Sequence, residues 1–142
     1  MIAFGPDTRK HPRYRVTLPM RFSLISGEDR RRVSRFYRTS LRDLGLGGVS
    51  IVTPVLKLDG IHFFYNAIPT VRNQIMMQIY LPGQDLPLVA LGYAAQGRVV
   101  RIQDRRAYLV GINFLQINET QGQRLRRFLQ GLASSQSARV NP

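Results

Sequence analysis

Hydrophobic and polar residues alternate along most of the chain, as expected for strands that bury one face. The alternation is strict from residue 16 to residue 24, where one face carries Val16, Leu18, Met20, Phe22 and Leu24. A second strand with poorer alternation is expected over 34–43, and a third begins at Val49, after the glycine-rich sequence LGLGG. These patterns predict a first half built from short antiparallel strands.

The second half of the chain continues this pattern. Two further predicted strands each collect apolar residues on one face, namely Ile75, Met77, Ile79 and Leu81 in one and Tyr108, Val110, Ile112 and Phe114 in the other. Between them, a strand over 88–102 contains Gly92 and Gly97, which inside strands often mark bends or bulges. A hairpin turn is expected at Asp104–Arg106. The number of strands and turns predicts a small antiparallel barrel or sandwich.

Two regions break the strand pattern. Residues 54–72 are expected to form an irregular connection, with breaks at Asp59-Gly60 and at Pro69. Residues 118–132 are expected to form a helix, with Asn118 as its N-cap and an apolar stripe at helical spacing made of Leu125, Phe128, Leu129 and Leu132. This stripe is expected to pack on the strands, and residues 133–142 are expected to be a disordered tail.

Length and composition indicate one globular domain. The chain has 142 residues, of which 44% are hydrophobic and 20% charged, and no apolar run is long enough for a transmembrane helix. The first ten residues do not have the pattern of a signal peptide, so a cytoplasmic location is expected. The absence of cysteine excludes disulfides, thiolate metal sites and cysteine nucleophiles.

The charge balance points to an anionic partner. Lysine and arginine total 21 against 8 acidic residues, which gives a formal net charge of +13, and only Lys10 and Lys57 are lysines. A guanidinium group can bind phosphate through two hydrogen bonds and can stack on flat rings, so the arginine bias favours nucleotides. Composition alone is equally compatible with a merely soluble cationic surface.

No arrangement of residues predicts catalysis. The two histidines, His11 and His62, lie far apart, and neither has an acid or a second histidine at metal-ligand spacing. The carboxylates are scattered, and no nucleophile, phosphate-loop or dinucleotide motif is present. We therefore expect a binding protein without enzymatic activity, metal or cofactor.

Two short segments carry the binding hypothesis. The first is RKHPRYR over 9–15, which is basic, and the second is RDLGLGG over 42–48. Glycines in the second segment allow positive φ angles and let backbone amides approach a ligand. The Asp43 carboxylate could accept from the N1 and N2 donors of guanine, while an arginine matches O6 and N7 on the other edge. The alternative is a turn started by aspartate, in which the glycines only shape a bend.

In order and spacing, the two segments resemble the PilZ domain signature, R-x-x-x-R followed by [D/N]-x-S-x-x-G. Arg9 and Arg13 match the first motif and DLGLGG the second, and the resemblance extends through GRVVRI and VGINFLQI to the terminal helix. It implies an all-β fold, a six-stranded antiparallel β-barrel with one C-terminal α-helix. In this reading residues 1–15 are a flexible basic leader, 16–132 the barrel and helix, and 133–142 the tail.

PilZ domains bind the second messenger cyclic di-GMP, usually as an intercalated dimer, so the resemblance implies this ligand. It makes Arg9 and Arg13 the clamp, Asp43 the reader of a guanine and Gly48 the glycine of closest approach. Gly45 stands where the family has serine, and the lost hydroxyl contact would weaken binding by about tenfold at most. Further candidate ligand contacts are Lys10, Arg98 and Arg101.

The expected mechanism is a switch. The leader would close over the ligand while Asp43 and the Gly45–Gly48 backbone hold it from the barrel, and an unidentified protein partner would read the changed surface. One alternative is a cationic barrel that binds RNA or single-stranded DNA through arginines and stacked aromatics such as Tyr14, Phe36 and Tyr37. Another is a nucleotide-free module that docks on a protein through residues 54–72. Membrane insertion is not expected.

Overall fold

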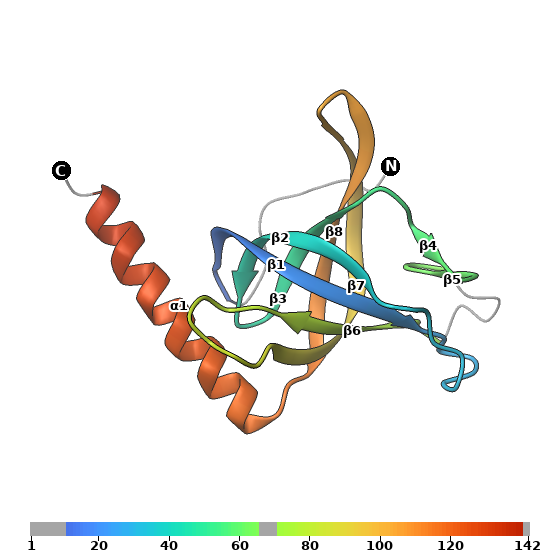
Figure 1. Ribbon diagram of the computed structural model, residues 1–142, viewed down its shortest axis with the longest axis horizontal. Helices are drawn as coiled ribbons and strands as arrows, with labels where there is room; N and C mark the ends of the chain where they lie inside the picture. The colour runs from blue at the N-terminus through green and yellow to red at the C-terminus, as the bar shows by residue number, and fades with distance from the viewer. Residues whose placement is uncertain (1–10, 66–70, 141–142) are drawn as a thin grey trace.

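The computed structural model describes residues 11–65 and 71–140, and six of its strands form an antiparallel barrel (Figure 1). The barrel strands are β1 (Arg13–Ile25), β2 (Tyr37–Gly45), β3 (Gly48–Thr53), β6 (Gln74–Ile79), β7 (Leu88–Ile102) and β8 (Arg105–Gln116). Their spatial order is β1-β2-β3-β8-β7-β6, and antiparallel pairing between β1 and β6 closes the barrel. The fold is therefore the predicted six-stranded antiparallel barrel, and the sandwich alternative is wrong.

The apolar faces recognised in the sequence line the barrel interior. Met20, Phe22 and Leu24 of β1 are at most 1% exposed, and the alternating residues Ile75, Met77 and Ile79 of β6 are fully buried. The strictly alternating part of β1 thus builds the core as predicted. Burying such side chains is the main favourable term in folding of a domain of this kind.

The first strand begins earlier than the sequence pattern indicated. Arg13, Tyr14 and Arg15 belong to β1 and pair with residues 43–45 of β2, so this part of the expected leader is regular strand. The expected start at Val16 was wrong because cations alternate with partly buried residues here and hide the strand pattern. The second strand, in contrast, starts later than expected, at Tyr37 and not at residue 34.

Strands β7 and β8 extend beyond the barrel as a two-stranded ribbon (Figure 1). β6 pairs with β7 only from Leu88 to Gly92, whereas β7 pairs with β8 up to Ile102. A register shift falls next to Gly92, which confirms the predicted bulge there, whereas Gly97 is regularly paired. The turn is at residues 103–104, both with positive φ, and not at Asp104–Arg106 as expected.

Residues 54–65 contain more regular structure than predicted. β4 (Lys57–Leu58) and β5 (Ile61–His62) form a small separate sheet. Asp59 and Gly60 join them with φ angles of 50° and 80°, so the predicted break is a tight hairpin turn. The expected break at Pro69 lies outside the described residues.

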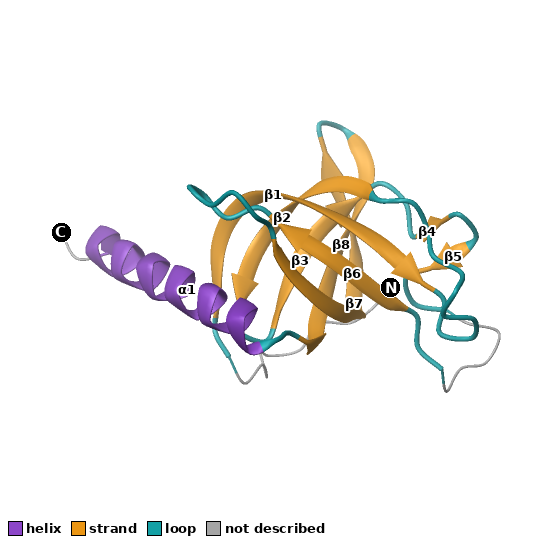
Figure 2. Cartoon of the chain, turned by 60° about the horizontal axis from the view of Figure 1, so that its bottom comes forward, coloured by secondary structure: helices purple, strands orange, loops and turns teal. Residues whose placement is uncertain are grey.

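One helix, α1 (Glu119–Val140), packs along one side of the barrel and contacts β1 and β7 (Figure 2). The predicted N-cap is confirmed, because the amide of Gln121 donates to Asn118 Oδ1 at 2.9 Å. Leu125 and Leu129 belong to the core, and the rest of the predicted stripe packs against it. Residues 133–140 are helical, so the predicted tail was wrong over this range. Within the described residues, no helix is apolar over enough length to cross a membrane.

Candidate functional site

Strand pairing brings the two binding motifs to the same end of the barrel. Arg13 lies opposite Gly45 and Arg15 opposite Asp43, because β1 and β2 run antiparallel in this register. On the next strand pair, Gly48 lies opposite Asn113 of β8. Arg13 of the first motif therefore lies beside the second motif on three consecutive strands, β1, β2 and β3, with β8 next to them. Arg9 and Lys10 lie outside the described residues.

Arg13 is the centre of a polar cluster. Its Nη1 forms an ion pair with Asp43 Oδ1 at 3.4 Å and donates to Ser50 Oγ at 3.1 Å. Its Nη2 donates to the Ile112 carbonyl at 3.3 Å and to Asn113 Oδ1 at 3.4 Å. The Arg13 side chain is only 4% exposed, whereas that of Asp43 is 28% exposed. Asp43 can thus still accept hydrogen bonds from a ligand while Arg13 holds it in place.

The glycines of the second motif make room for Arg13 and its neighbour. A β-carbon on Gly48 would lie 2.1 Å from the Ile112 carbonyl oxygen and 2.5 Å from Arg13 Nη2. A β-carbon on Gly45 would lie 2.5 Å from the Pro12 carbonyl oxygen. Within the described part of the chain, positive-φ glycines are Gly60 and Gly83, so the positive φ that the motif glycines allow is not used there. Space, and not backbone conformation, requires these glycines.

A groove of about 380 Å³ lies beside this cluster. Three arginines and a carboxylate meet there with an apolar floor; the lining residues are Arg15, Thr17, Arg42, Asp43, Val52, Arg98, Val100, Ile102 and Leu109. The three arginine residues are exposed. Guanidinium groups above an apolar floor suit a ligand that combines phosphates with flat rings. Its lining residues make the groove a candidate site for such a ligand.

The structure places some of the candidate residues named in the sequence analysis at the groove and others away from it. Asp43 and Arg98 both line the groove, and Arg13 contacts it through Asp43. Arg101 does not line it; it is exposed near the ribbon turn, where it donates to the Asp104 carbonyl at 3.3 Å. Sequence reasoning missed Arg15 and Arg42. The signal was present, because each lies within two residues of a motif position.

A second polar contact extends the cluster toward β7. Asn113 accepts from Arg13 and donates through Nδ2 to the Tyr93 hydroxyl at 3.3 Å. The Arg72 guanidinium lies over the Tyr93 ring, 4.3 Å from its centroid. Hydrogen bonds from Asn113 and Arg72 lower the pKa of Tyr93 because they stabilise the phenolate. Side chains from β1, β8 and β7 are thus connected in one network.

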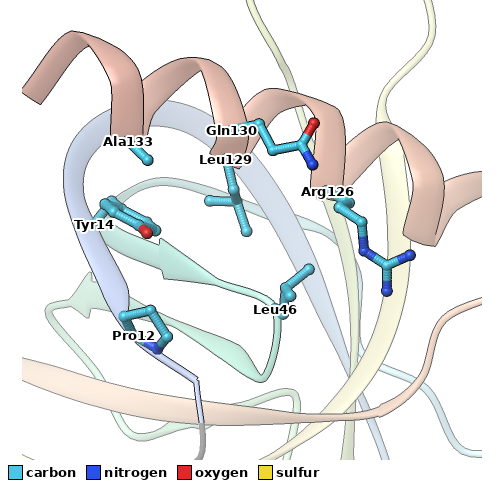
Figure 3. A pocket seen from close by; sticks show the side chains of 7 residues that line it. All are labelled: Pro12, Tyr14, Leu46, Arg126, Leu129, Gln130 and Ala133. Carbon is cyan, nitrogen blue, oxygen red and sulfur yellow. The ribbon is translucent and has the colours of Figure 1, made fainter. Parts of the chain in front are cut away.

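The aromatic residues named for nucleic-acid stacking do not share a surface. Tyr14 faces a separate cavity of about 280 Å³ between β1 and α1, together with Leu46 and Leu129 (Figure 3). The Phe36 ring is covered by the Arg21 guanidinium at 4.5 Å. Tyr37 packs on Phe22, with ring centroids 5.7 Å apart. This arrangement is no stacking platform for consecutive bases.

The described residues contain no group of three or more potential metal-ligating side chains. The pKa of His62 is lowered, first by burial and second by the charge of Lys57. Its Nδ1 accepts from the Phe64 amide at 3.0 Å and the Tyr65 amide at 3.4 Å. His62 therefore stabilises the end of the β4-β5 hairpin.

Comparison with known proteins agrees with this geometry. The model of the PilZ domain family matches residues 7–131. No curated protein matches the sequence.

Three solved structures have the same fold. The PilZ domain of YcgR from Escherichia coli with cyclic di-GMP superposes with a TM-score of 0.60 at 15% identity, over 95% of this chain and 98% of that one. The MrkH complex with cyclic di-GMP from K. pneumonia gives 0.61 at 12%, over 94% and 56%. The inhibitor of motility MotI/DgrA from Bacillus subtilis gives 0.58 at 16%, over 93% and 53%. The chain thus spans nearly all of the first structure and about half of the other two.

The family match covers most of the chain, and among the described residues Arg13 of the first motif lies beside Asp43 and Gly45 of the second. The chain belongs to the PilZ domain family.

Proposed function

We propose that the chain is a cyclic di-GMP receptor that binds its ligand in the groove beside Arg13 and Asp43. The observation that carries this proposal is the contact between Arg13 and Asp43, which joins two motifs separated by 30 residues at the edge of a cationic groove. The cyclic di-GMP in the YcgR and MrkH structures supports the choice of ligand. In this proposal the domain acts by binding and not by catalysis.

The proposed roles follow from burial and charge. Asp43 accepts from the N1 and N2 donors of one guanine, and Arg13 keeps its carboxylate in the required orientation. Arg15, Arg42 and Arg98 surround the phosphates, because they are exposed around the same groove. Arg9 and Lys10 would approach from the side of the leader. Arg101 has no part in this site.

Signalling would follow from the segment that precedes β1. Arg13 is held by hydrogen bonds to β2, β3 and β8, so it stays in place and the moving part ends before it. On binding, the segment carrying Arg9 and Lys10 would change position over the groove and alter the surface that a partner contacts. This revises the simpler expectation that Arg13 itself moves onto the ligand.

Isothermal titration calorimetry with cyclic di-GMP, GMP and a single-stranded oligonucleotide tests the ligand. Binding of cyclic di-GMP alone is expected, with a loss of about tenfold or more in Arg15→Ala or Arg42→Ala, because each removes a charged hydrogen-bond donor. Asp43→Ala should abolish measurable binding. Arg127→Ala, which removes an exposed arginine of α1, is the matched control and should bind like the wild type.

Arg13→Ala is informative together with a measure of folding, because several hydrogen bonds are lost at once. Thermal unfolding followed by circular dichroism separates lost binding from lost structure. Equal binding of the oligonucleotide, or unchanged affinity in both Asp43→Ala and Arg15→Ala, would contradict the proposal.

A further inference from the structure

The inner face of the β7-β8 ribbon borders an apolar cavity of about 430 Å³, distinct from the ligand groove. We call it the ribbon pocket; it is lined by Leu56, Phe64, Tyr65, Gly97, Arg98, Val99 and Tyr108. A β-carbon on Gly97 would lie 3.0 Å from Phe64 Cζ, so the glycine lets this ring pack directly on the ribbon backbone. The pocket therefore has aromatic walls, and its lining at Gly97 is bare backbone.

Large apolar side chains beside the ribbon pocket face solvent. Tyr65 is 74% exposed and Val99 is 47% exposed. Apolar area that a partner removes from water favours association by about 25 cal/mol per Å². A side chain inserted between these residues would cover both.

A pair of like charges continues this face of the ribbon toward its turn. Arg101 on β7 is directly opposite Arg106 on β8. Two residues nearer the barrel, on the same face of the ribbon, Val99 is opposite Tyr108, and both of these residues line the ribbon pocket. Like charges directly opposite each other destabilise an antiparallel pair. Within the described residues, no carboxylate forms an ion pair with either arginine. An anionic partner would relieve this repulsion.

We infer that the ribbon pocket and the arginine pair dock an acidic segment of a partner protein, which inserts one aromatic or large aliphatic side chain into the pocket. Charge and shape together select this occupant. The cations are concentrated at the ribbon turn beside a concave apolar cavity, as required by an apolar anchor flanked by carboxylates. A nucleic acid would require cations spaced along a groove to follow successive phosphates, and the pocket itself is mainly apolar.

This site goes beyond the proposed nucleotide receptor and can be tested separately from it. The arginine pair shares the face of Val99, whereas the ligand groove is lined by Val100 and Leu109 on the other face of the ribbon. Arg98 lines both cavities and is left unchanged in the test.

Fluorescence anisotropy with a fluorescein-labelled peptide provides the test. The probe is a short peptide of aspartates and glutamates with one central phenylalanine, titrated with the full chain at physiological ionic strength. Arg101→Glu/Arg106→Glu should weaken binding by about tenfold or more, since attraction becomes repulsion. Tyr65→Ala should weaken it as well, and because this side chain is 74% exposed the effect on the fold should be small.

Matched controls separate the site from the overall positive charge. Arg126→Glu/Arg127→Glu makes the same change in charge on exposed residues of α1 and should leave peptide binding within about twofold of wild type. A peptide with serine in place of phenylalanine should bind about tenfold more weakly. Cyclic di-GMP titration of the ribbon variant should match wild type, so failure of one proposal does not imply failure of the other.

Three results would overturn the inference. The first is equal weakening by the ribbon and α1 charge reversals, and the second is equal binding of the phenylalanine and serine peptides. The third is tighter binding of a single-stranded oligonucleotide than of the peptide, if Arg101→Glu/Arg106→Glu abolishes this oligonucleotide binding.

Discussion

The guanidinium of Arg13 lies in the space that a side chain on Gly48 would need, 2.5 Å from the position of its β-carbon. The glycine and the arginine belong to different motifs and are close because β1, β2, β3 and β8 are neighbours. The two motifs thus depend on each other sterically, before any ligand binds.

Gly48→Ala should destabilise the fold and weaken ligand binding. The added methyl group would overlap Arg13 and the Ile112 carbonyl, and overpacking of this kind costs about 1–3 kcal/mol. Chemical denaturation measures the loss. Gly131→Ala, on the exposed side of α1 with nothing within 4 Å, is the control and should stabilise by about 1 kcal/mol through helix propensity. A Gly48→Ala protein as stable as wild type would show that the site can relax freely.

Gly45→Ser, which restores the family serine, should not improve cyclic di-GMP binding. Its β-carbon would lie 2.5 Å from the Pro12 carbonyl oxygen, so the backbone before Arg13 must shift. We expect a loss of stability of roughly 1–3 kcal/mol and no gain in affinity, measured by thermal unfolding and calorimetry. Tighter binding with unchanged stability would mean that the absent hydroxyl, and not the fit to Pro12, governs this position.

Tyr93 should ionise below the ordinary tyrosine value of about 10. Its pKa is lowered mainly by the hydrogen bond from Asn113 and next by that from Arg72. The folded pKa lies below the unfolded one, so the contribution to stability is present above the unfolded pKa and is lost as pH falls through the folded pKa. In an ultraviolet titration, phenolate absorbance rises with pH, and the part of this rise at the lowest pH should be absent in Tyr93→Phe. Asn113→Ala should shift that part to higher pH. Superimposable curves for wild type and Tyr93→Phe would contradict this assignment.

Mild acid should weaken the β4-β5 hairpin through His62. Burial, and second the charge of Lys57, lower the pKa of His62, so its contribution to stability is present above the unfolded pKa of about 6.5. That contribution is lost as pH falls through the folded pKa, because protonated Nδ1 cannot accept from the Phe64 amide. The free energy of unfolding, measured by chemical denaturation at about pH 8 and about pH 5, should change less between the two pH values in His62→Asn than in wild type. An equal dependence in both proteins would exclude this role.

Local patterns predicted most of the fold. Alternation located the strands because half-buried strands repeat every two residues, and the spacing of Leu125 and Leu129 located α1. The β4-β5 hairpin was missed because strands of two residues are too short to show alternation. The end of α1 was missed because small polar residues give a weak helical signal.

The candidate site was predicted only in part. The motifs named Arg13 and Asp43, and the structure brings this pair together. The steric role of Gly48 could not be predicted, because it depends on Ile112, which is distant in sequence and reaches the glycine only through the pairing of β3 with β8. Arg42 was overlooked although it directly precedes the motif residue Asp43, because its place beside the groove depends on how the strands pair.

The projection of β7 and β8 beyond the barrel has a consequence for amide exchange. Beyond Val99 and Tyr108, where the pairing of β8 with β3 ends, β7 and β8 pair only with each other, and a two-stranded ribbon in water is only marginally stable. Amides near the turn at residues 103–104 should therefore exchange with deuterium through local opening, whereas those of Phe22 and Ile79 in the barrel should exchange only through global unfolding. The ribbon tip can thus change shape many times during the lifetime of one folded barrel.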